Sequence, residues 1–211
     1  ALRYFPVYTD GKWGVIDSRG NIVIEPTYDE YIVIPDNQKA IFICTINVNY
    51  TDNTYDTRVL NEKGEELFTD YDLVEAIENY DESNNLWYQA GLLKVSKDGK
   101  YGLIDTNGSQ IANCDYGSIV ALRGVENSLL TEKDGKYGLI DNVGSTIINN
   151  NYEEIIPISD RFEDGYIVKN EDDKYGVITY TKTVAVQENY DNIKSVYGGG
   201  KYYIVNENNN W

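Results

Sequence analysis

One stretch, Asp10–Gly20, constrains the fold more than any other because nearly the same residues return twice. Its sequence, DGKWGVIDSRG, reappears as DGKYGLIDTNG at residues 98–108 and as DGKYGLIDNVG at residues 134–144. Partial copies occur at residues 57–64 and 173–182. One apolar position recurs with spacings of 44, 44, 36 and 38 residues, at Ile16, Leu60, Ile104, Ile140 and Ile178. The chain is therefore a repeat protein, and the repeat predicts architecture far better than activity.

Each repeat reads as short strands separated by turns. The Asp-Gly pairs at 10–11, 98–99 and 134–135 are typical of two-residue hairpins, in which both central residues take positive φ. The second turn, Asp-x-x-Gly, predicts a longer hairpin loop with Gly in the left-handed position. The apolar runs between turns hold about four to six residues, too few for helices. For residues 71–80 alone, the sequence is compatible with either a helix or a strand.

A repeat of about 36–44 residues with three or four short antiparallel strands is typical of a propeller blade or a solenoid rung. We predict an all-β repeat protein of five repeats forming a small β-propeller-like ring, with an open curved β-solenoid as the alternative. The 211 residues form one domain in this interpretation, with repeats at about 1–38, 39–85, 86–125, 126–162 and 163–199. Residues 201–211 align with residues 3–13, which predicts a partial sixth repeat at 200–211.

An aromatic residue followed by Gly marks most repeats, and we interpret these pairs as structural. An aromatic residue at one fixed repeat position most often packs in the core or between repeats. The adjacent Gly is expected where backbones of neighbouring repeats approach closely. The pairs are Trp13–Gly14, Tyr101–Gly102, Tyr137–Gly138 and Tyr175–Gly176, whereas the second repeat has Thr57–Arg58 instead.

The charge balance excludes some partners. With 18 basic and 35 acidic residues the net charge is −17, which disfavours nucleic acid and anionic membranes as partners. Acidic groups can attract Ca²⁺ or basic ligands, but a solubilising surface is the simpler interpretation. No apolar run is long enough to insert into a membrane. Cys44 and Cys114 are far apart and are expected to be buried free thiols. A chain that begins at Ala1, lacks Met and shows no signal segment is expected to be a mature or excised piece.

The recurring Gly-Lys-Trp-Gly-Val-Ile-Asp, continued by Gly, Ile, Pro and Tyr-Asp within residues 11–29, resembles the bacterial WG-repeat family. The resemblance extends over essentially the whole chain and is clearest in the first, third and fourth repeats. The resemblance implies an all-β array, often in bacterial surface or secreted proteins. The family has no established catalytic residues, so the resemblance implies none in this sequence. A weaker likeness is to cell-wall (choline) binding repeats, whose unit is about half as long.

Catalytic and metal signals are few. The absence of His removes Ser-His and Cys-His nucleophile pairs and zinc-His sites. One Asp per Asp-x-x-Gly turn is better explained by turn geometry than by a calcium loop, which needs several oxygen ligands at short spacing. We therefore expect no cofactor, no metal and no enzyme activity. A glycosidase that uses two carboxylates is the remaining catalytic alternative.

Two insertions, near residues 47–57 and 78–89, break the repeat spacing. Residues outside the register are not required by repeat packing, and binding residues tend to lie on loops over a rigid scaffold. Aromatic residues among Asn and Asp suit stacking on a carbohydrate or peptide. The predicted ligand-binding residues are Tyr50, Tyr55, Trp87 and Tyr88. The alternative is that Trp87 and Tyr88 begin the next strand and only pack.

We accordingly predict a non-catalytic module that recognises a glycan, peptide or protein, on or outside a bacterial cell. A structural spacer within a longer array is the main alternative in a different class.

Overall fold

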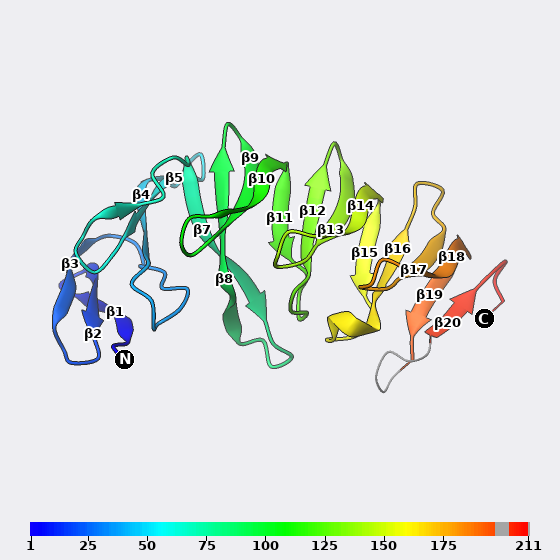
Figure 1. Ribbon diagram of the computed structural model, residues 1–211, viewed down its shortest axis with the longest axis horizontal. Helices are drawn as coiled ribbons and strands as arrows, with labels where there is room; N and C mark the ends of the chain where they lie inside the picture. Colours follow the sequence, from blue (N-terminus) through cyan, green and yellow to red (C-terminus); the bar gives the residue numbers. More distant parts are fainter. Residues whose placement is uncertain (197–202, 211) are drawn as a thin grey trace. The chain divides into compact units, whose positions relative to one another are not determined.

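The computed structural model describes residues 1–196 and 203–210. The described chain forms β strands and one short 3-10 helix, and the strands make six small antiparallel sheets (Figure 1). The predicted all-β fold is confirmed. The residues cluster into two compact units: residues 1–77 with 88–114, and residues 78–87 with 115–211.

The first compact unit holds two sheets and most of a third. The first sheet, in order β1-β2-β3, consists of Tyr4–Thr9, Lys12–Asp17 and Ile22–Tyr28. The second, β4-β5-β6, consists of Phe42–Asn49, Thr54–Leu60 and Glu66–Leu67, and Val33 forms a bridge to Ile43 of β4. The third, β10-β9-β8-β7, consists of β7 (Leu73–Tyr80), β8 (Leu86–Lys97), β9 (Lys100–Asp105) and β10 (Gln110–Tyr116).

The second compact unit takes in the end of the β7–β8 hairpin, residues 78–87, and all later strands. One sheet, in order β11-β12-β13-β14, consists of Ser118–Ala121, Leu129–Lys133, Lys136–Ile140 and Thr146–Tyr152. The next, β15-β16-β17-β18, consists of Glu154–Pro157, Tyr166–Lys169, Tyr175–Ile178 and Val184–Tyr190. The 3-10 helix η1 is Phe162–Asp164, and β19 (Asn192–Ser195) pairs with β20 (Tyr203–Asn206).

The sheets are offset from the predicted repeats. The sheet β11-β12-β13-β14 extends from residue 118 to residue 152, so its first strand comes from the predicted repeat 86–125 and the rest from 126–162. The sheet β15-β16-β17-β18 begins at residue 154, before the repeat predicted at 163–199. Because each of these sheets takes its first strand from the preceding repeat, one repeat cannot complete a sheet alone.

The turn chemistry predicted from the sequence is confirmed. Asp10 and Gly11 have φ of 51° and 79°, and the equivalent Asp-Gly pairs at 98–99 and 134–135 also have positive φ at both residues. In the longer turn, the Asp17 carboxylate accepts the backbone N–H groups of Arg19 and Asn21 at 2.9 and 3.0 Å. The left-handed residue of that turn is Gly20, with φ of 84°. In the fifth repeat a lysine takes the same conformation, since Lys182 has φ of 69°.

The repeated glycines make the expected close approach, but within one sheet rather than between repeats. A Cβ atom on Gly14 would lie 2.5 Å from the carbonyl oxygen of Ile24 on the neighbouring strand β3. The pairing of β2 with β3 shifts register at this point, so extra residues of β3 stand opposite Gly14. The same approach recurs at 2.6–2.7 Å for the glycines of the third, fourth and fifth repeats, Gly102, Gly138 and Gly176.

Arg58 shows what happens where the glycine is missing. Its side chain begins with a Cβ atom that the bulged arrangement cannot hold against a backbone oxygen. The pairing of β5 with β6 accordingly has no register shift, and β6 ends after Glu66–Leu67. The corresponding strands of the other repeats, β3, β10, β14 and β18, each have 7 residues. The loss of one glycine thus goes with a shortened third strand.

Both insertions lengthen hairpins. Residues 47–57 form the far end of the hairpin between β4 and β5, and residues 78–89 form that of the hairpin between β7 and β8. Residues 73–80, for which helix and strand were both open, are strand β7.

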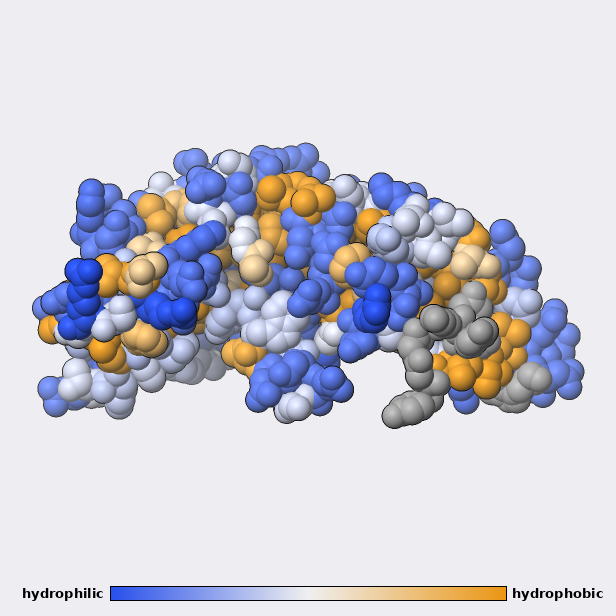
Figure 2. Space-filling model, turned by 60° about the horizontal axis from the view of Figure 1, so that its bottom comes forward, coloured by the Kyte–Doolittle hydropathy of each residue, from blue (hydrophilic) through white to orange (hydrophobic). Residues whose placement is uncertain are grey.

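Each compact unit has its own buried core. In the first unit apolar clusters gather around Val15 and Phe42 and around Leu93 and Ile104; in the second they gather around Leu139 and Ile148 and around Ile167 and Val177. Cys44 is buried, Cys114 is half-buried, and both are free thiols. Hydrophilic residues cover much of the face shown in Figure 2, with apolar patches between them. No helix of the described chain is long and apolar enough to cross a membrane.

Candidate functional site

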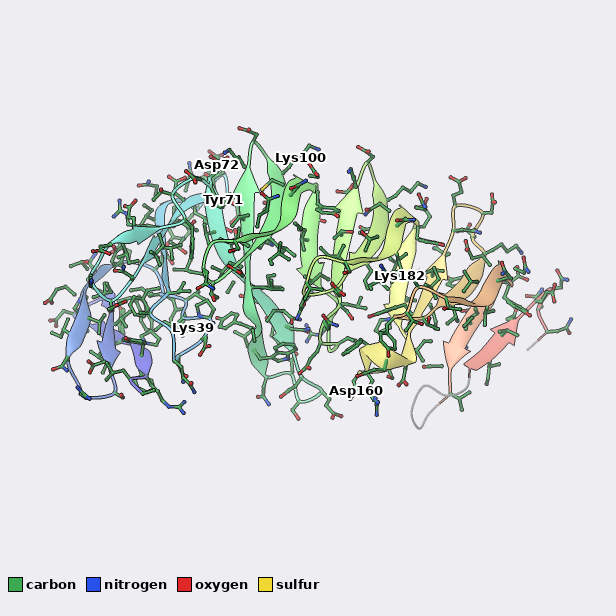
Figure 3. The ribbon with its side chains drawn as sticks, in the orientation of Figure 1. Lys39, Tyr71, Asp72, Lys100, Asp160 and Lys182 are labelled. Atoms are coloured by element: carbon green, nitrogen blue, oxygen red, sulfur yellow. The ribbon has the colours of Figure 1, made fainter. Side chains whose placement is uncertain are left out.

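A concavity of about 770 Å³ lies within the second compact unit, and we call it the hairpin pocket. Three connections line it: the tip of the β7–β8 hairpin, the β11–β12 loop and the β15–β16 loop with η1. Each of these connects the first strand of a sheet to the second strand. Figure 1 shows all three on the lower side of the view, and Figure 3 labels Asp160 in the β15–β16 loop. The volume is in the range of small-molecule and cofactor pockets.

The hairpin tip is held by the same kind of turn as the repeats. The carboxylate of Asp81 accepts the backbone N–H groups of Ser83 and Asn85 at 2.9 and 2.8 Å, and Asn84 takes the left-handed conformation with φ of 65°. These hydrogen bonds, led by the one from the backbone of Asn85, lower the pKa of Asp81. The tip therefore presents the side chains of Tyr80 and Trp87 from a defined turn.

Asn79 fixes the β11–β12 loop to strand β7. Its side chain is buried, and its Nδ2 donates to the carbonyl oxygens of Val125 at 3.0 Å and Leu122 at 3.3 Å. Its Oδ1 accepts the backbone N–H of Gly124 at 2.8 Å. One amide thus satisfies backbone groups of a loop more than 40 residues away in the sequence.

The β15–β16 loop is anchored by polar and aromatic contacts. The Ser159 hydroxyl donates to the Asp164 carboxylate at 2.5 Å, and the Phe162 ring meets Tyr180 edge-on at 5.4 Å. Directly after the loop, the hydroxyl of the buried Tyr166 lies 2.5 Å from the hydroxyl of Ser128, the residue before β12. The loop is therefore tied to the neighbouring sheet as well as to its own.

The hairpin pocket combines aromatic rings with many charges. Tyr80, Trp87 and Phe162 are half-buried aromatic residues in its lining. Two guanidinium groups, of Arg123 and Arg161, face five carboxylates, those of Asp81, Glu82, Glu126, Asp160 and Glu163. The Arg123 guanidinium lies 4.4 Å from the centre of the Tyr80 ring and donates to Asn84. The charge of the lining is therefore predominantly negative.

The structure does not bring the four predicted ligand-binding residues together. Trp87 lines the hairpin pocket, whereas Tyr88 is half-buried in β8 and lies outside its lining. Tyr50 lines a different concavity of about 510 Å³ in the first compact unit, and its hydroxyl donates to Glu30. The Tyr55 hydroxyl donates to Glu75 at 2.7 Å, and burial together with this carboxylate raises the pKa of Tyr55 to about 12.

The aromatic residues of the repeat motif lie at packing positions. Tyr137 packs against the core of the second unit around Leu139, and Tyr175 against the one around Ile167. The Lys94 ammonium lies 5.2 Å from the centre of the Tyr101 ring. Trp13 packs against the core around Val15 and Phe42. Its ring also lies between Tyr8 at 5.0 Å and Tyr31 at 4.8 Å, both of which are exposed.

Sequence reasoning missed several residues of the hairpin pocket. Tyr80 lay within the recognised insertion, but neither the β11–β12 loop with Arg123 nor the β15–β16 loop with Phe162 changes the repeat spacing enough to be noticed. The length of the segment between first and second strands would have been the signal. Among the described residues, no group of three His, Cys, Asp or Glu side chains is placed to hold a metal ion.

The sequence was compared with protein-family models, and one model matches part of it. Residues 13–42 match the family model described as WG containing repeat. No curated protein matches the chain. A solved structure of PorZ, described as an essential bacterial surface component of the type-IX secretion system of Porphyromonas gingivalis, is similar over 94% of this chain and 27% of that chain, at 10% identity and a TM-score of 0.29. That TM-score is too low to establish a common fold. The family-model match confirms what the Gly-Lys-Trp-Gly motif predicted for this segment: residues 13–42 are a WG-containing repeat.

Proposed function

We propose that the chain is a non-catalytic recognition module that binds a peptide or glycan ligand in the hairpin pocket. The observation that carries this proposal is the convergence of three connections, each fixed to the β scaffold, around half-buried aromatic rings. Repeat packing does not require these connections, and rigidly presented loops with aromatic residues are a common design for binding sites. Trp87 is the proposed central contact.

The absence of catalysis is part of the same proposal. The oxygen atoms of Asp81 already accept hydrogen bonds from its turn, which lower its pKa and make this carboxyl a poor general acid. The neighbouring Glu82 and Asp160 are exposed side chains on loops. A glycosidase would need a proton-donating carboxyl at neutral pH beside a second one at a set separation.

We further propose that the sheets follow one another in a propeller-like ring, with an open curved solenoid as the alternative, and that the protein acts at the bacterial surface or after secretion. The offset between sheets and repeats supports a continuous stack, because neighbouring repeats must share strands. Small-angle scattering separates the two arrangements, since a ring gives a compact, nearly spherical envelope and a solenoid an elongated one. Protease accessibility on intact cells tests the location.

The binding proposal is tested by probing glycan and peptide arrays with the protein and two variants, Trp87→Ala and Tyr50→Ala. The second is a matched control, because Tyr50 is 79% exposed and lines the other concavity. We expect array ligands whose signal is lost in Trp87→Ala and kept in Tyr50→Ala, while both variants keep the circular dichroism spectrum of the parent. Binding lost only in Tyr50→Ala would move the site to the first compact unit. No ligand on either array would favour a structural spacer and contradict the proposal.

A further inference from the structure

We propose that the ligand of the hairpin pocket is a peptide segment with at least two basic side chains, and that an arginine of this segment stacks on Trp87. This inference rests on the proposed function and narrows it to one class of ligand. It combines three features of the pocket: its excess of carboxylates, its aromatic lining and the contacts of its own arginines.

The carboxylates are only partly neutralised by the protein. Arg123 is engaged with the ring of Tyr80 and with Asn84, and Arg161 lies 3.9 Å from the Glu163 carboxylate. Across the described chain, no basic side chain forms an ion pair with Glu82, Glu126 or Asp160. Glu82 comes from the hairpin tip, Glu126 from the β11–β12 loop and Asp160 from the β15–β16 loop, so each of the three connections contributes one of these carboxylates to the lining. A ligand with several positive charges can approach all three.

The aromatic lining favours arginine over other cations. A guanidinium group is planar, stacks on aromatic rings and pairs with carboxylates through two parallel hydrogen bonds. The pocket already holds one such arrangement, because the Arg123 guanidinium lies over the Tyr80 ring at 4.4 Å. Trp87 lines the same pocket, is half-buried, and offers the aromatic side chain that attracts cations most strongly.

The same features disfavour the other ligands. An anionic ligand would meet five carboxylates with only two guanidinium groups, both of which have partners. A neutral glycan can stack on Trp87 but gains nothing from the charges of Glu126 and Asp160, so its affinity would not depend on salt. A basic peptide is also drawn towards the chain as a whole, whose net charge is −17, and this long-range attraction is screened by salt.

The test measures fluorescence anisotropy of a labelled peptide of alternating arginine and glycine, with the full chain, at low and high salt. The matched probes are the same peptide with lysine, the same peptide with citrulline, which is uncharged, and a neutral chito-oligosaccharide. We expect the arginine peptide to bind more tightly than the lysine peptide, and salt to weaken both. The citrulline peptide and the sugar should bind at least tenfold more weakly than the arginine peptide.

Variants of the protein test whether the arginine peptide binds in the hairpin pocket. Glu126→Gln and Asp160→Asn should each weaken binding of the arginine peptide by about 1.5- to 5-fold, the effect of one partly exposed ion pair. Glu62→Gln is the control, since it removes the same charge from an exposed turn of the first compact unit and should leave affinity unchanged. Arg123→Ala should strengthen binding, because it removes a like charge and exposes the Tyr80 ring, whereas an anionic ligand would lose affinity.

The outcomes separate the inference from the proposed function. Trp87-dependent binding of the sugar or of citrulline peptide, without dependence on salt or on Glu126 and Asp160, overturns the basic-peptide inference and leaves the recognition module standing. Arginine-peptide binding that survives Trp87→Ala and falls equally in Glu62→Gln and Glu126→Gln is unspecific attraction and also overturns it. If no probe and no array ligand binds, both proposals fail.

Discussion

Replacing Asn79 by alanine should loosen the hairpin pocket while leaving the fold intact. The change removes one buried amide that serves the β11–β12 loop, so the N–H of Gly124 and the carbonyl of Val125 lose their partners at 2.8 and 3.0 Å. A buried polar group without a partner costs about 1–3 kcal/mol. The carbonyl of Leu122 keeps a second hydrogen bond, from the N–H of Val125 at 3.1 Å. Gly124 is half-buried, so water recovers part of its loss.

The expected loss in the free energy of unfolding is therefore about 2–4 kcal/mol, a large fraction of the roughly 5–15 kcal/mol typical of a folded protein. Urea denaturation followed by circular dichroism measures it. The control is Asn151→Ala, which truncates an exposed asparagine in the same compact unit and should change stability by less than about 0.5 kcal/mol. Because the same loop carries Arg123 and Glu126, Asn79→Ala should also weaken ligand binding without touching the ligand.

A second variant tests the orientation of the amide. Asn79→Asp keeps an acceptor for the Gly124 N–H but places a carboxylate oxygen against the carbonyl oxygens of Leu122 and Val125. It should therefore destabilise the protein more than alanine does at neutral pH, because repulsion and a buried charge are added. A loss below about 0.5 kcal/mol for Asn79→Ala, or a smaller loss for aspartate than for alanine, would refute this account of the loop.

Three further predictions concern the scaffold. Gly138→Ala should destabilise the protein by about 1–3 kcal/mol in urea denaturation, because its Cβ would lie 2.7 Å from the Ile148 carbonyl oxygen; an unchanged midpoint would mean that the two strands separate freely. Lys174→Ala breaks an ion pair with Asp191 at 2.5 Å, but both side chains are exposed to solvent, so the midpoint of urea denaturation should fall only slightly and the effect should shrink further in salt. Burial and Glu188 raise the pKa of Tyr152 to about 12 from the ordinary value of 10.0, so the stability this group contributes is complete below pH 10 and is lost as the pH rises towards 12. Tyr152→Phe should flatten that alkaline decline in stability, and an equally steep decline in the variant would contradict the assignment.

The sequence predicted the turns and strands because their causes are local. The Asp-Gly pairs at 10–11, 98–99 and 134–135 all take positive φ at both residues, and the carboxylate of Asp17 accepts hydrogen bonds from backbone groups only two and four residues ahead. The grouping of strands into sheets was not predictable in the same way. Whether β11 pairs with β12 or ends the preceding sheet depends on contacts across a loop, and the repeat spacing is the same in both cases.

The candidate site was predictable only in part, for a related reason. Trp87 stood out because it breaks the repeat register. Asn79 did not stand out, because the sequence around it does not indicate hydrogen bonds to residues 43 and 46 positions later. Three other residues depart from the repeat register in the same way but lie outside the hairpin pocket: Tyr50, Tyr55 and Tyr88. A residue that departs from the repeat is one that repeat packing does not require. Which of these residues lie close together depends on the fold.

Within a sheet, the repeated residues and the residues that depart from the repeat lie in different connections between strands. In the sheets β7–β10 and β11–β14, the connections from second to third and third to fourth strands are the repeated Asp-Gly and Asp-x-x-Gly turns, where φ and backbone hydrogen bonds restrict the residues. The connection from first to second strand joins one repeat to the next, and only the one between β7 and β8 has a turn of this kind, at Asp81–Asn84. That connection varies in length between β7 and β8, β11 and β12, and β15 and β16. The three of them line one concavity. On the proposed function, substitutions in these connections alone would change the ligand, while the glycines and turns that hold the sheets together stay the same.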